Sequence, residues 1–308
     1  DDQGKYLSRI DQIGRGPSEY IEITDFTASL KENNIVIYDD KQQKVLKYDL
    51  DGNFIDATRI NYWPLGISFT PNQKELALVS PRPMEVYSNN HSIMVMDKSW
   101  KPKAQLIKHD IEDTEDYLKK SICFYTFFEY EDSLTLWESY CDTIFRITDD
   151  RKVIPRYHLD LGKDNMPHEL AAYDEKFNHH ITEYSIIDKV LESKHYLFIS
   201  GIYKGYLKEI FCDKRSNECH NLVFNLSIKD HGFHNDIDGG APFWPYGVVG
   251  NGWVFGSFQA TDLQTYWTFD DYFDNMEVKY PERQKTLEAI VENSTIDSNP
   301  IIQLVKLK

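Results

Sequence analysis

The sequence predicts an all-β protein of the β-propeller class, with four-stranded antiparallel blades and short helical insertions. A strand–turn–strand unit recurs at roughly 40 to 50 residues, which is the spacing of propeller blades. The 20 Tyr, 17 Phe and 6 Trp favour strands and supply a core. Clusters of turn residues separate the short apolar runs. A pair of β-sandwiches also fits short, evenly spaced strands, but the repeated four-strand unit favours the propeller.

The clearest unit spans residues 23–60. Residues 35–38, 45–48 and 54–60 read as three strands divided by turn-forming residues, and residues 25–29 supply a fourth, innermost strand. The same order of strands continues along the chain with decreasing clarity. The later units cover residues 65–109, 123–162, 182–229 and 243–308.

The last of these units is one strand short, whereas residues 4–13 form a strand without partners that has the pattern of an outermost one. These residues either complete the last unit or belong to a sixth, truncated blade. We therefore expect one propeller domain over residues 1–308, with six blades: five visible repeats and a partial N-terminal one. Closing the ring with both ends of the chain would remove open sheet edges that invite aggregation.

Three segments break the strand pattern and are predicted to be helical. Residues 112–120 have acids first and lysines last, as the helix dipole favours. Residues 166–177 and 281–292 each place a proline in a plausible first turn. The first two helices would lie between blades and could form part of a lid over the channel. The third has an apolar stripe formed by Leu287, Ile290 and Val291.

The charge of the chain argues against several partner classes. The formal net charge is −16, from 50 acidic and 34 basic residues. Because a polyanion would be repelled, we expect no nucleic-acid partner and no binding to anionic membrane surfaces. No run approaches the roughly 18 apolar residues that a membrane-spanning helix requires.

The four cysteines fall into two pairs, each symmetric about a predicted hairpin turn. Cys123 and Cys141 flank a turn at Asp132, and Cys212 and Cys219 flank a turn at residues 215–216. Residues equidistant from a hairpin turn face each other across the ladder, close enough for a disulfide at non-hydrogen-bonded sites. Two such pairs indicate an oxidising compartment. The alternative is four reduced cysteines that act as small apolar residues.

Two aromatic–Trp–Pro turns resemble each other: YWPLG at residues 62–66 and FWPYG at residues 243–247. Each directly precedes a predicted innermost strand, so both are expected on one face of the ring, at the mouth of the channel. Exposed aromatic rings there could stack on sugars or anchor a peptide. The alternative is that each Trp-Pro unit wedges between blades. The ligand-binding candidates in these turns are Tyr62, Trp63, Phe243, Trp244 and Tyr246.

The turn GRGPSEY, residues 14–20, supplies two more candidates, Arg15 and Glu19. Its glycines allow close approach of the backbone, and Pro17 stiffens the turn. Arg15 could bind a carboxylate at the channel mouth. Alternatively, Arg15 pairs with Glu19 or with a neighbouring blade and fixes the turn. The segment lacks the Lys-Ser/Thr ending and the following helix of a phosphate-binding loop.

The segment DHGFHNDIDGG gathers candidate metal ligands within eight residues. Imidazoles and carboxylates at this spacing could hold a divalent metal, which can generate a hydroxide nucleophile. Asp, Asn and Gly in succession are equally typical of a solvated turn. The candidates are His231, His234, Asp236 and Asp238.

Three stretches of the chain resemble the six-bladed, NHL-like propeller lipoproteins of Bacteroidetes: residues 13–26, residues 35–55 and residues 299–308. The resemblance implies a six-bladed ring, export, lipid anchoring through a cysteine upstream of this chain, and no assigned activity. The opening strands and the lipobox of that family are absent from these residues, so the resemblance alone implies the sixth blade and the anchor. The Gly-Arg-Gly-Pro-x-Glu-Tyr turn of the family is matched by Gly14, Arg15, Gly16, Pro17, Glu19 and Tyr20.

Two hypotheses about function follow, because no catalytic arrangement can be read from the chain: it has no G-x-S-x-G elbow, and its ten histidines are scattered. The first is a non-catalytic module of the cell envelope, in the periplasm or on the outer membrane. It would bind a glycan, a peptide or an envelope protein across the face bearing Trp63 and Trp244, without a cofactor. The second is a metal-dependent hydrolase or lyase with its metal at the channel. Inward polar ligands from several blades would favour the enzyme, and the sequence has one local cluster, so binding leads.

Overall fold

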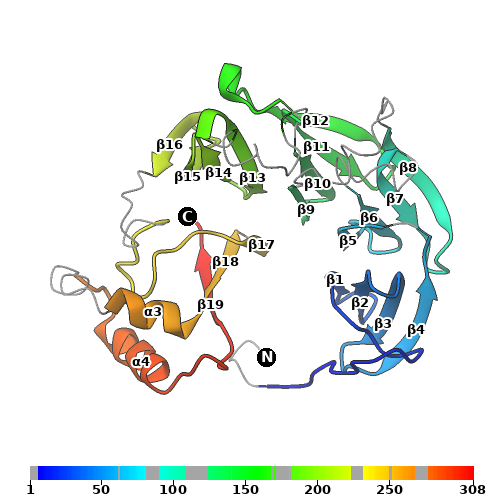
Figure 1. Ribbon diagram of the computed structural model, residues 1–308, viewed down its shortest axis with the longest axis horizontal. Coiled ribbons are helices and arrows are strands. Elements are labelled where there is room, and N and C mark those ends of the chain that lie inside the picture. The colour runs from blue at the N-terminus through cyan, green and yellow to red at the C-terminus, as the bar shows by residue number, and fades with distance from the viewer. Residues whose placement is uncertain are drawn as a thin grey trace. The chain divides into compact units, whose positions relative to one another are not determined.

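The computed structural model describes residues 6–61, 63–80, 90–108, 124–139, 141–167, 170, 180, 182–222, 232–249, 252–267 and 277–308. Within these residues the chain forms five antiparallel sheets, four of four strands and one of three (Figure 1). Each sheet uses strands that are consecutive in the sequence. The predicted class, an all-β propeller protein with four-stranded antiparallel blades, is confirmed. The chain divides into two compact units, Asp1–Ile186 and Ile187–Lys308, which are described separately.

The first unit holds three four-stranded sheets, each a simple up-and-down meander. The first sheet consists of β1 (Asp25–Ser29), β2 (Asn34–Asp39), β3 (Lys44–Asp49) and β4 (Phe54–Arg59). The second consists of β5 (Gly66–Phe69), β6 (Leu76–Val79), β7 (His91–Met96) and β8 (Pro102–Lys108). The third consists of β9 (Tyr125–Tyr130), β10 (Ser133–Glu138), β11 (Thr143–Thr148) and β12 (Val153–His158), and the short 3-10 helix η2 (Gly162–Asp164) follows.

The middle strands of the first sheet are apolar on both faces because a packing partner covers each face. Successive side chains of a strand point to opposite sides. Val36 and Tyr38 of β2 therefore pack into one cluster with residues of the second sheet. Ile37, between them, packs on the other side with Leu46 and Tyr20. This second cluster fixes the segment that leads into β1 against the sheet.

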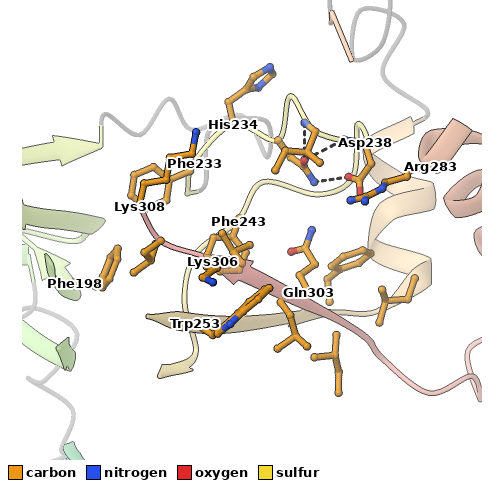
Figure 2. Close-up of a pocket in the computed structure, with 18 of the residues that line it drawn as sticks. Phe198, Phe233, His234, Asp238, Phe243, Trp253, Arg283, Gln303, Lys306 and Lys308 are labelled. Atoms are coloured by element: carbon orange, nitrogen blue, oxygen red, sulfur yellow. Dashed lines mark hydrogen bonds between the residues drawn. The ribbon is translucent and has the colours of Figure 1, made fainter. Parts of the chain in front are cut away.

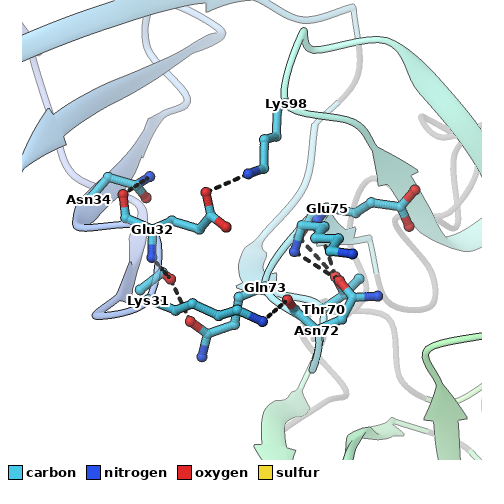
Figure 3. A network of polar contacts seen from close by, with 10 residues as sticks. Lys31, Glu32, Asn34, Thr70, Asn72, Gln73, Glu75 and Lys98 are labelled. Carbon is cyan, nitrogen blue, oxygen red and sulfur yellow. Dashed lines mark hydrogen bonds and ion pairs between the residues drawn. The ribbon is translucent and has the colours of Figure 1, made fainter.

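Polar contacts join the three sheets of the first unit. The Asp25 carboxylate of β1 accepts a hydrogen bond of 2.8 Å from the backbone N–H of Ile67 in β5. The Tyr125 hydroxyl of β9 donates to the Leu65 carbonyl at 2.6 Å. Further bonds between turns of different sheets appear in Figure 3, among them the ion pair of Lys98 with Glu32.

The second unit holds one four-stranded and one three-stranded sheet. The four-stranded sheet consists of β13 (Ser185–Glu192), β14 (Tyr196–Tyr203), β15 (Tyr206–Asp213) and β16 (Glu218–Leu222). The other consists of β17 (Gly247–Val249), β18 (Trp253–Phe258) and β19 (Ile301–Lys306). Two helices, α3 (Ala260–Trp267) and α4 (Pro281–Glu292), come between β18 and β19.

The helical insertion at residues 281–292 is confirmed, with Pro281 in its first turn. Its predicted stripe is only partly right. Val291 is buried and Leu287 packs beside it, whereas Ile290 is 48% exposed. Helix α3 was not predicted: its first two residues, Ala260 and Thr261, read as the end of a strand, and a helix was expected only at residues 281–292. The predicted helices at residues 112–120 and 166–177 lie almost entirely outside the described residues.

The disulfide between Cys212 and Cys219 is confirmed. The two residues face each other in the register of β15 and β16, as their symmetry about the turn predicted. Cys123 lies outside the described residues, so its pairing with Cys141 stays a prediction.

The predicted outermost strand over residues 4–13 is wrong where the structure describes it. Residues 6–12 have no regular secondary structure, and Ile13 forms only an isolated parallel bridge with Tyr20. The hydrogen bonds of Tyr20 and Gly14 explain this, because they direct the local backbone toward the turn at residues 14–20 and away from a sheet ladder. The described residues thus form five sheets, and a sixth blade stays a prediction.

Candidate functional site

A pocket of about 580 Å³ in the first unit brings together two of the predicted ligand-binding residues, Arg15 and Trp63. We call it the basic pocket. It is formed by the turn at residues 14–20, the turn between β2 and β3, the end of β4 and the segment before β5. Its lining consists of Arg15, Ile21, Asp40, Lys41, Gln42, Gln43, Arg59 and Trp63.

The turn that carries Arg15 is tied to the β2–β3 hairpin. The buried ammonium group of Lys44 donates to the Gly16 carbonyl at 3.0 Å and also to the Glu19 carbonyl. The Gln42 side-chain amide donates to the Gly14 carbonyl at 3.2 Å. These bonds hold the backbone on both sides of Arg15, so its Cα has a fixed position before any ligand arrives.

Arg15 and Arg59 are exposed, and neither guanidinium makes a hydrogen bond or an ion pair with the part of the chain that the structure describes. Lys41 differs, since its ammonium group lies 3.5 Å from Glu22 and 3.6 Å from Asp40. Asp40, and after it Glu22, raises the pKa of Lys41. The lining thus holds three cations and one carboxylate, although the whole chain carries a charge of −16.

Trp63 supplies the aromatic surface of the basic pocket. The residue is 42% exposed, and its carbonyl accepts a hydrogen bond of 2.9 Å from the Ser80 hydroxyl. The Trp-Pro segment directly precedes β5, as expected. Its neighbour Tyr62 lies outside the described residues.

Glu19 does not line the basic pocket. Its carboxylate folds back into the turn and accepts a hydrogen bond of 2.7 Å from the backbone N–H of Gly16. Among the described residues, Arg15 makes no ion pair with Glu19. Glu19 therefore shapes the turn, and the guanidinium of Arg15 remains available.

The second aromatic–Trp–Pro turn has a different environment. Phe243 is buried, and Trp244 stacks on Phe233 at a ring distance of 5.8 Å and meets Phe198 edge-on at 5.6 Å. This packing favours, for Phe243 and Trp244, the alternative in which the Trp-Pro turn serves as a structural element of the fold. Tyr246 is 56% exposed, and the ammonium group of Lys189 lies 4.7 Å from its ring centre.

An apolar groove of about 700 Å³ in the second unit runs along β19 (Figure 2). Every residue from Ile301 to Lys308 lines it, which is possible only along the edge of a strand. Leu307 donates its N–H to Gly252, so alternation along the ladder turns the backbone groups of Ile302, Leu304 and Lys306 outward. No described residue pairs with this outer edge.

The candidate metal ligands show the features of a turn. Asp238 accepts hydrogen bonds from the Asn235 side-chain amide at 2.8 Å and from the N–H of Gly240 at 3.1 Å. The described residues contain no group of three His, Cys, Asp or Glu side chains placed to hold a metal ion. His231 lies outside them, so the predicted set including His234 and Asp236 is not tested as a whole.

The second unit also contains a partly buried polar row across β13, β14 and β15. The Ser200 hydroxyl donates to Asp188 at 2.5 Å, and Ser200 stands opposite Glu209 in the register. Burial, and to a lesser extent Asp188, raises the pKa of Glu209 to about 7, against the opposing N–H of Gly232. Glu209 thereby links the sheet to the segment that lines the groove.

Sequence reasoning missed Arg59, Lys41 and the two glutamines of the basic pocket. Arg59 ends β4 and stands four residues before Trp63, while Lys41 lies in the β2–β3 turn. Both lie next to motifs that were recognised. The basic residue four positions before the Trp-Pro turn was the signal in the sequence that could have indicated this pocket.

Several comparisons with known proteins bear on the chain. The family model of a domain of unknown function, DUF4934, matches residues 1–306. No curated protein sequence matches. A crystal structure from Bacteroides fragilis, of a protein named as exported, is 15% identical with a TM-score of 0.73, over 100% of this chain and 84% of that one. This likeness shows the fold alone.

Two further solved structures are more distant. A DUF4221 family member from Bacteroides vulgatus is 13% identical with a TM-score of 0.44, over 69% of each chain. A virginiamycin B lyase from Staphylococcus aureus is 14% identical with a TM-score of 0.39, over 67% of this chain and 57% of that one. Neither carries weight at such scores. From the match over nearly its whole length, the chain belongs to the DUF4934 family of unknown function.

Proposed function

We propose that this chain is a non-catalytic binding protein of the cell envelope that holds a carboxylate-bearing ligand in the basic pocket. The observation that carries the proposal is the pair Arg15 and Arg59, whose guanidinium groups line one pocket without an anionic partner among the described residues. A guanidinium presents paired N–H groups that match a carboxylate. Trp63 beside them offers an apolar face for the rest of the ligand.

The lining supports binding rather than catalysis. It contains no His, Cys, Ser, Thr or Tyr among the described residues, so it offers no hydroxyl, thiol or imidazole nucleophile, and the amine of Lys41 is held beside a carboxylate. Its single carboxylate, Asp40, lies beside Lys41. Arginine and glutamine side chains orient a ligand through hydrogen bonds and do not exchange protons near neutral pH.

The setting of this function in the cell envelope rests on likeness and chemistry. The similar solved protein of Bacteroides fragilis is named as exported. A disulfide between Cys212 and Cys219 fits an oxidising compartment outside the cytoplasm. No helix in the described part of the chain is long and apolar enough to cross a membrane. The exported neighbour and the disulfide support a location outside the cytoplasm, in the periplasm or on the outer membrane, and the resemblance of residues 13–26 and 35–55 to propeller lipoproteins adds a lipid anchor to the proposal.

Six blades of the NHL-like type are part of the same proposal. Four sheets have four strands and the sheet of β19 has three, with exposed apolar side chains at Ile302 and Leu304 on its outer edge. An edge of this kind favours pairing with another strand. We expect a fourth strand to pair with this edge in the apolar groove and complete the fifth sheet, whereas the sixth blade is proposed from the resemblance alone. A crystal structure in which the edge of β19 stays open would contradict the fourth strand.

Calorimetric titration with tricarballylate, a flexible tricarboxylate without a ring, tests the anion site. We expect binding that weakens as ionic strength rises and falls on the order of tenfold in R15A and in R59A. The control is R9A, which removes an exposed arginine that is paired with Asp11 outside the pocket. Equal affinity in the wild type and in the double variant R15A/R59A would contradict the proposal.

A further inference from the structure

We infer that the ligand of the basic pocket is a sugar acid, a pyranose ring that carries a carboxylate. This inference rests on the proposed function and narrows it. Three kinds of residue line the pocket together: two arginines, the partly exposed Trp63, and the polar residues Asp40 and Gln43. Gln42 also lines the pocket, but its side-chain amide already donates hydrogen bonds within the turn.

Each kind of group matches a different part of a sugar acid. The carboxylate fits between Arg15 and Arg59, which supply paired N–H donors. The C–H face of a pyranose is flat and apolar, so it can cover the indole of Trp63, a residue that is 42% exposed and lines the pocket. The ring hydroxyls remain, and they need both acceptors and donors, which carboxylate and amide side chains provide.

Asp40 separates a sugar acid from a simple anion. Its nearest cation contact, to Lys41, is 3.6 Å long, and its side chain is 36% exposed. A hydroxyl of a sugar can donate a hydrogen bond to this carboxylate, whereas a carboxylate ligand without hydroxyls cannot. The lining carries three cations against this one carboxylate, so its charge favours an anion, and Asp40 favours an anion that also bears hydroxyls.

The lining also disfavours a peptide. Peptide recognition uses either an open strand edge or apolar pockets for side chains. Only Ile21 and Trp63 are apolar among the residues that line the basic pocket. Among the described residues, the strand edge that lines a groove with apolar walls is that of β19 in the second unit. The test therefore compares an acidic peptide with the sugar acid.

The turn that presents Arg15 is already ordered, which lowers the entropic cost of binding. Lys44 and Gln42 hold its carbonyls, and the Tyr48 hydroxyl donates to the Ser18 carbonyl at 2.8 Å. Because the backbone of the turn needs no further ordering, the conformational cost of binding falls mainly on the side chains of Arg15 and Arg59.

Calorimetry with four probes tests the inference: methyl glucuronide, methyl glucoside, tricarballylate and a tetraglutamate peptide. We expect the glucuronide to bind on the order of tenfold more tightly than each of the others. W63A should lower the affinity for the glucuronide on the order of tenfold and leave tricarballylate within about twofold, whereas W63F keeps most of the affinity. The control W253A, in the second unit, should change neither.

The outcomes separate the two proposals. If tricarballylate or tetraglutamate binds as well as the glucuronide and loses affinity in R15A, the anion site stands and the sugar acid is overturned. If methyl glucoside binds as well as the glucuronide, the role of the carboxylate is overturned. If no probe binds, or if R15A and R59A change nothing, both proposals fall. Thermal unfolding of each variant shows whether a loss of binding comes from a loss of folding.

Discussion

The Glu19 carboxylate accepts a hydrogen bond of 2.7 Å from the backbone N–H of Gly16, three residues earlier in the same turn. The carboxylate is therefore enclosed by the backbone that presents Arg15. A Cβ atom added at Gly14 would come within 2.0 Å of Glu19 Oε2. The absence of a side chain at this position is what lets the carboxylate close the turn and leave the arginine outside it.

G14A should therefore distort the turn and weaken binding in the basic pocket. The clash forces Glu19 or the backbone to move, and overpacking of this kind costs about 1–3 kcal/mol. We expect a lower melting temperature and weaker binding of the glucuronide, both measured on the same preparation. Gly52 provides the control, because it lies in the turn between β3 and β4 and has a positive φ of 87°. G52A should therefore lower stability and leave binding unchanged. Unchanged stability and binding in G14A would contradict the role of Glu19 in the turn.

Mutations in the two Trp-Pro turns should differ in their effect on stability. Trp244 packs against Phe198 and Phe233, so W244A removes a well-packed aromatic side chain and should destabilise the protein by about 3 kcal/mol. Trp63 is more exposed, and W63A should cost less stability. Denaturant unfolding measures both. A larger loss of stability in W63A than in W244A would contradict the assignment of a structural role to Trp244.

The repeat of strands and turns predicted the blades well, because each strand forms with its neighbour in the sequence. The register of β2 and β3, for example, follows from the local turn between them. The prediction was wrong at residues 4–13, where the pattern of an outermost strand is present but long-range contacts decide the conformation. Ile10 packs beside Tyr20 in the core cluster of Ile37, and this contact cannot be read from local periodicity.

The basic pocket was predictable only in part. Arg15 and Trp63 were identified separately, each from its own motif, yet only the fold brings them to one pocket. Trp63 and Trp244 looked equivalent in sequence, and their burial distinguishes them. The partner of Trp244 is Phe233, which lies in a segment that the sequence marked as a metal site and not as an aromatic cluster.

Glu209 should make the stability depend on pH in a defined direction. Burial raises its pKa from 4.5 to about 7 in the folded chain, so between these values the unfolded chain has lost the proton and the folded chain retains it. Stability therefore falls as pH rises from 4.5 to 7, by an amount on the order of 3 kcal/mol, and stays reduced above it.

E209Q should remove this dependence, because glutamine is neutral and can still accept the hydrogen bond from Gly232. We expect the variant to gain stability relative to the wild type at pH 8 and to match it at pH 4.5, measured by urea unfolding at both values. The exposed Glu218 gives the control E218Q, which should show no such difference. A constant difference between E209Q and the wild type at both pH values would contradict the raised pKa.

The disulfide between Cys212 and Cys219 closes a short loop with a sequence separation of 7. Constraining such a loop in the unfolded chain stabilises the protein by about 2–3 kcal/mol. We expect the double variant C212S/C219S to lose this much stability and to keep binding in the basic pocket, which lies in the other unit. Alkylation followed by mass measurement checks the bond itself, and modification of both cysteines without reductant would contradict it.

The central claim is that Arg15, Arg59 and Trp63 act together on one ligand. A crystal structure of the protein soaked with methyl glucuronide tests this most directly. We predict that the carboxylate lies within hydrogen-bond distance of both guanidinium groups and that the pyranose ring lies on the indole of Trp63. A glucuronide bound elsewhere, with the basic pocket empty, would contradict the account.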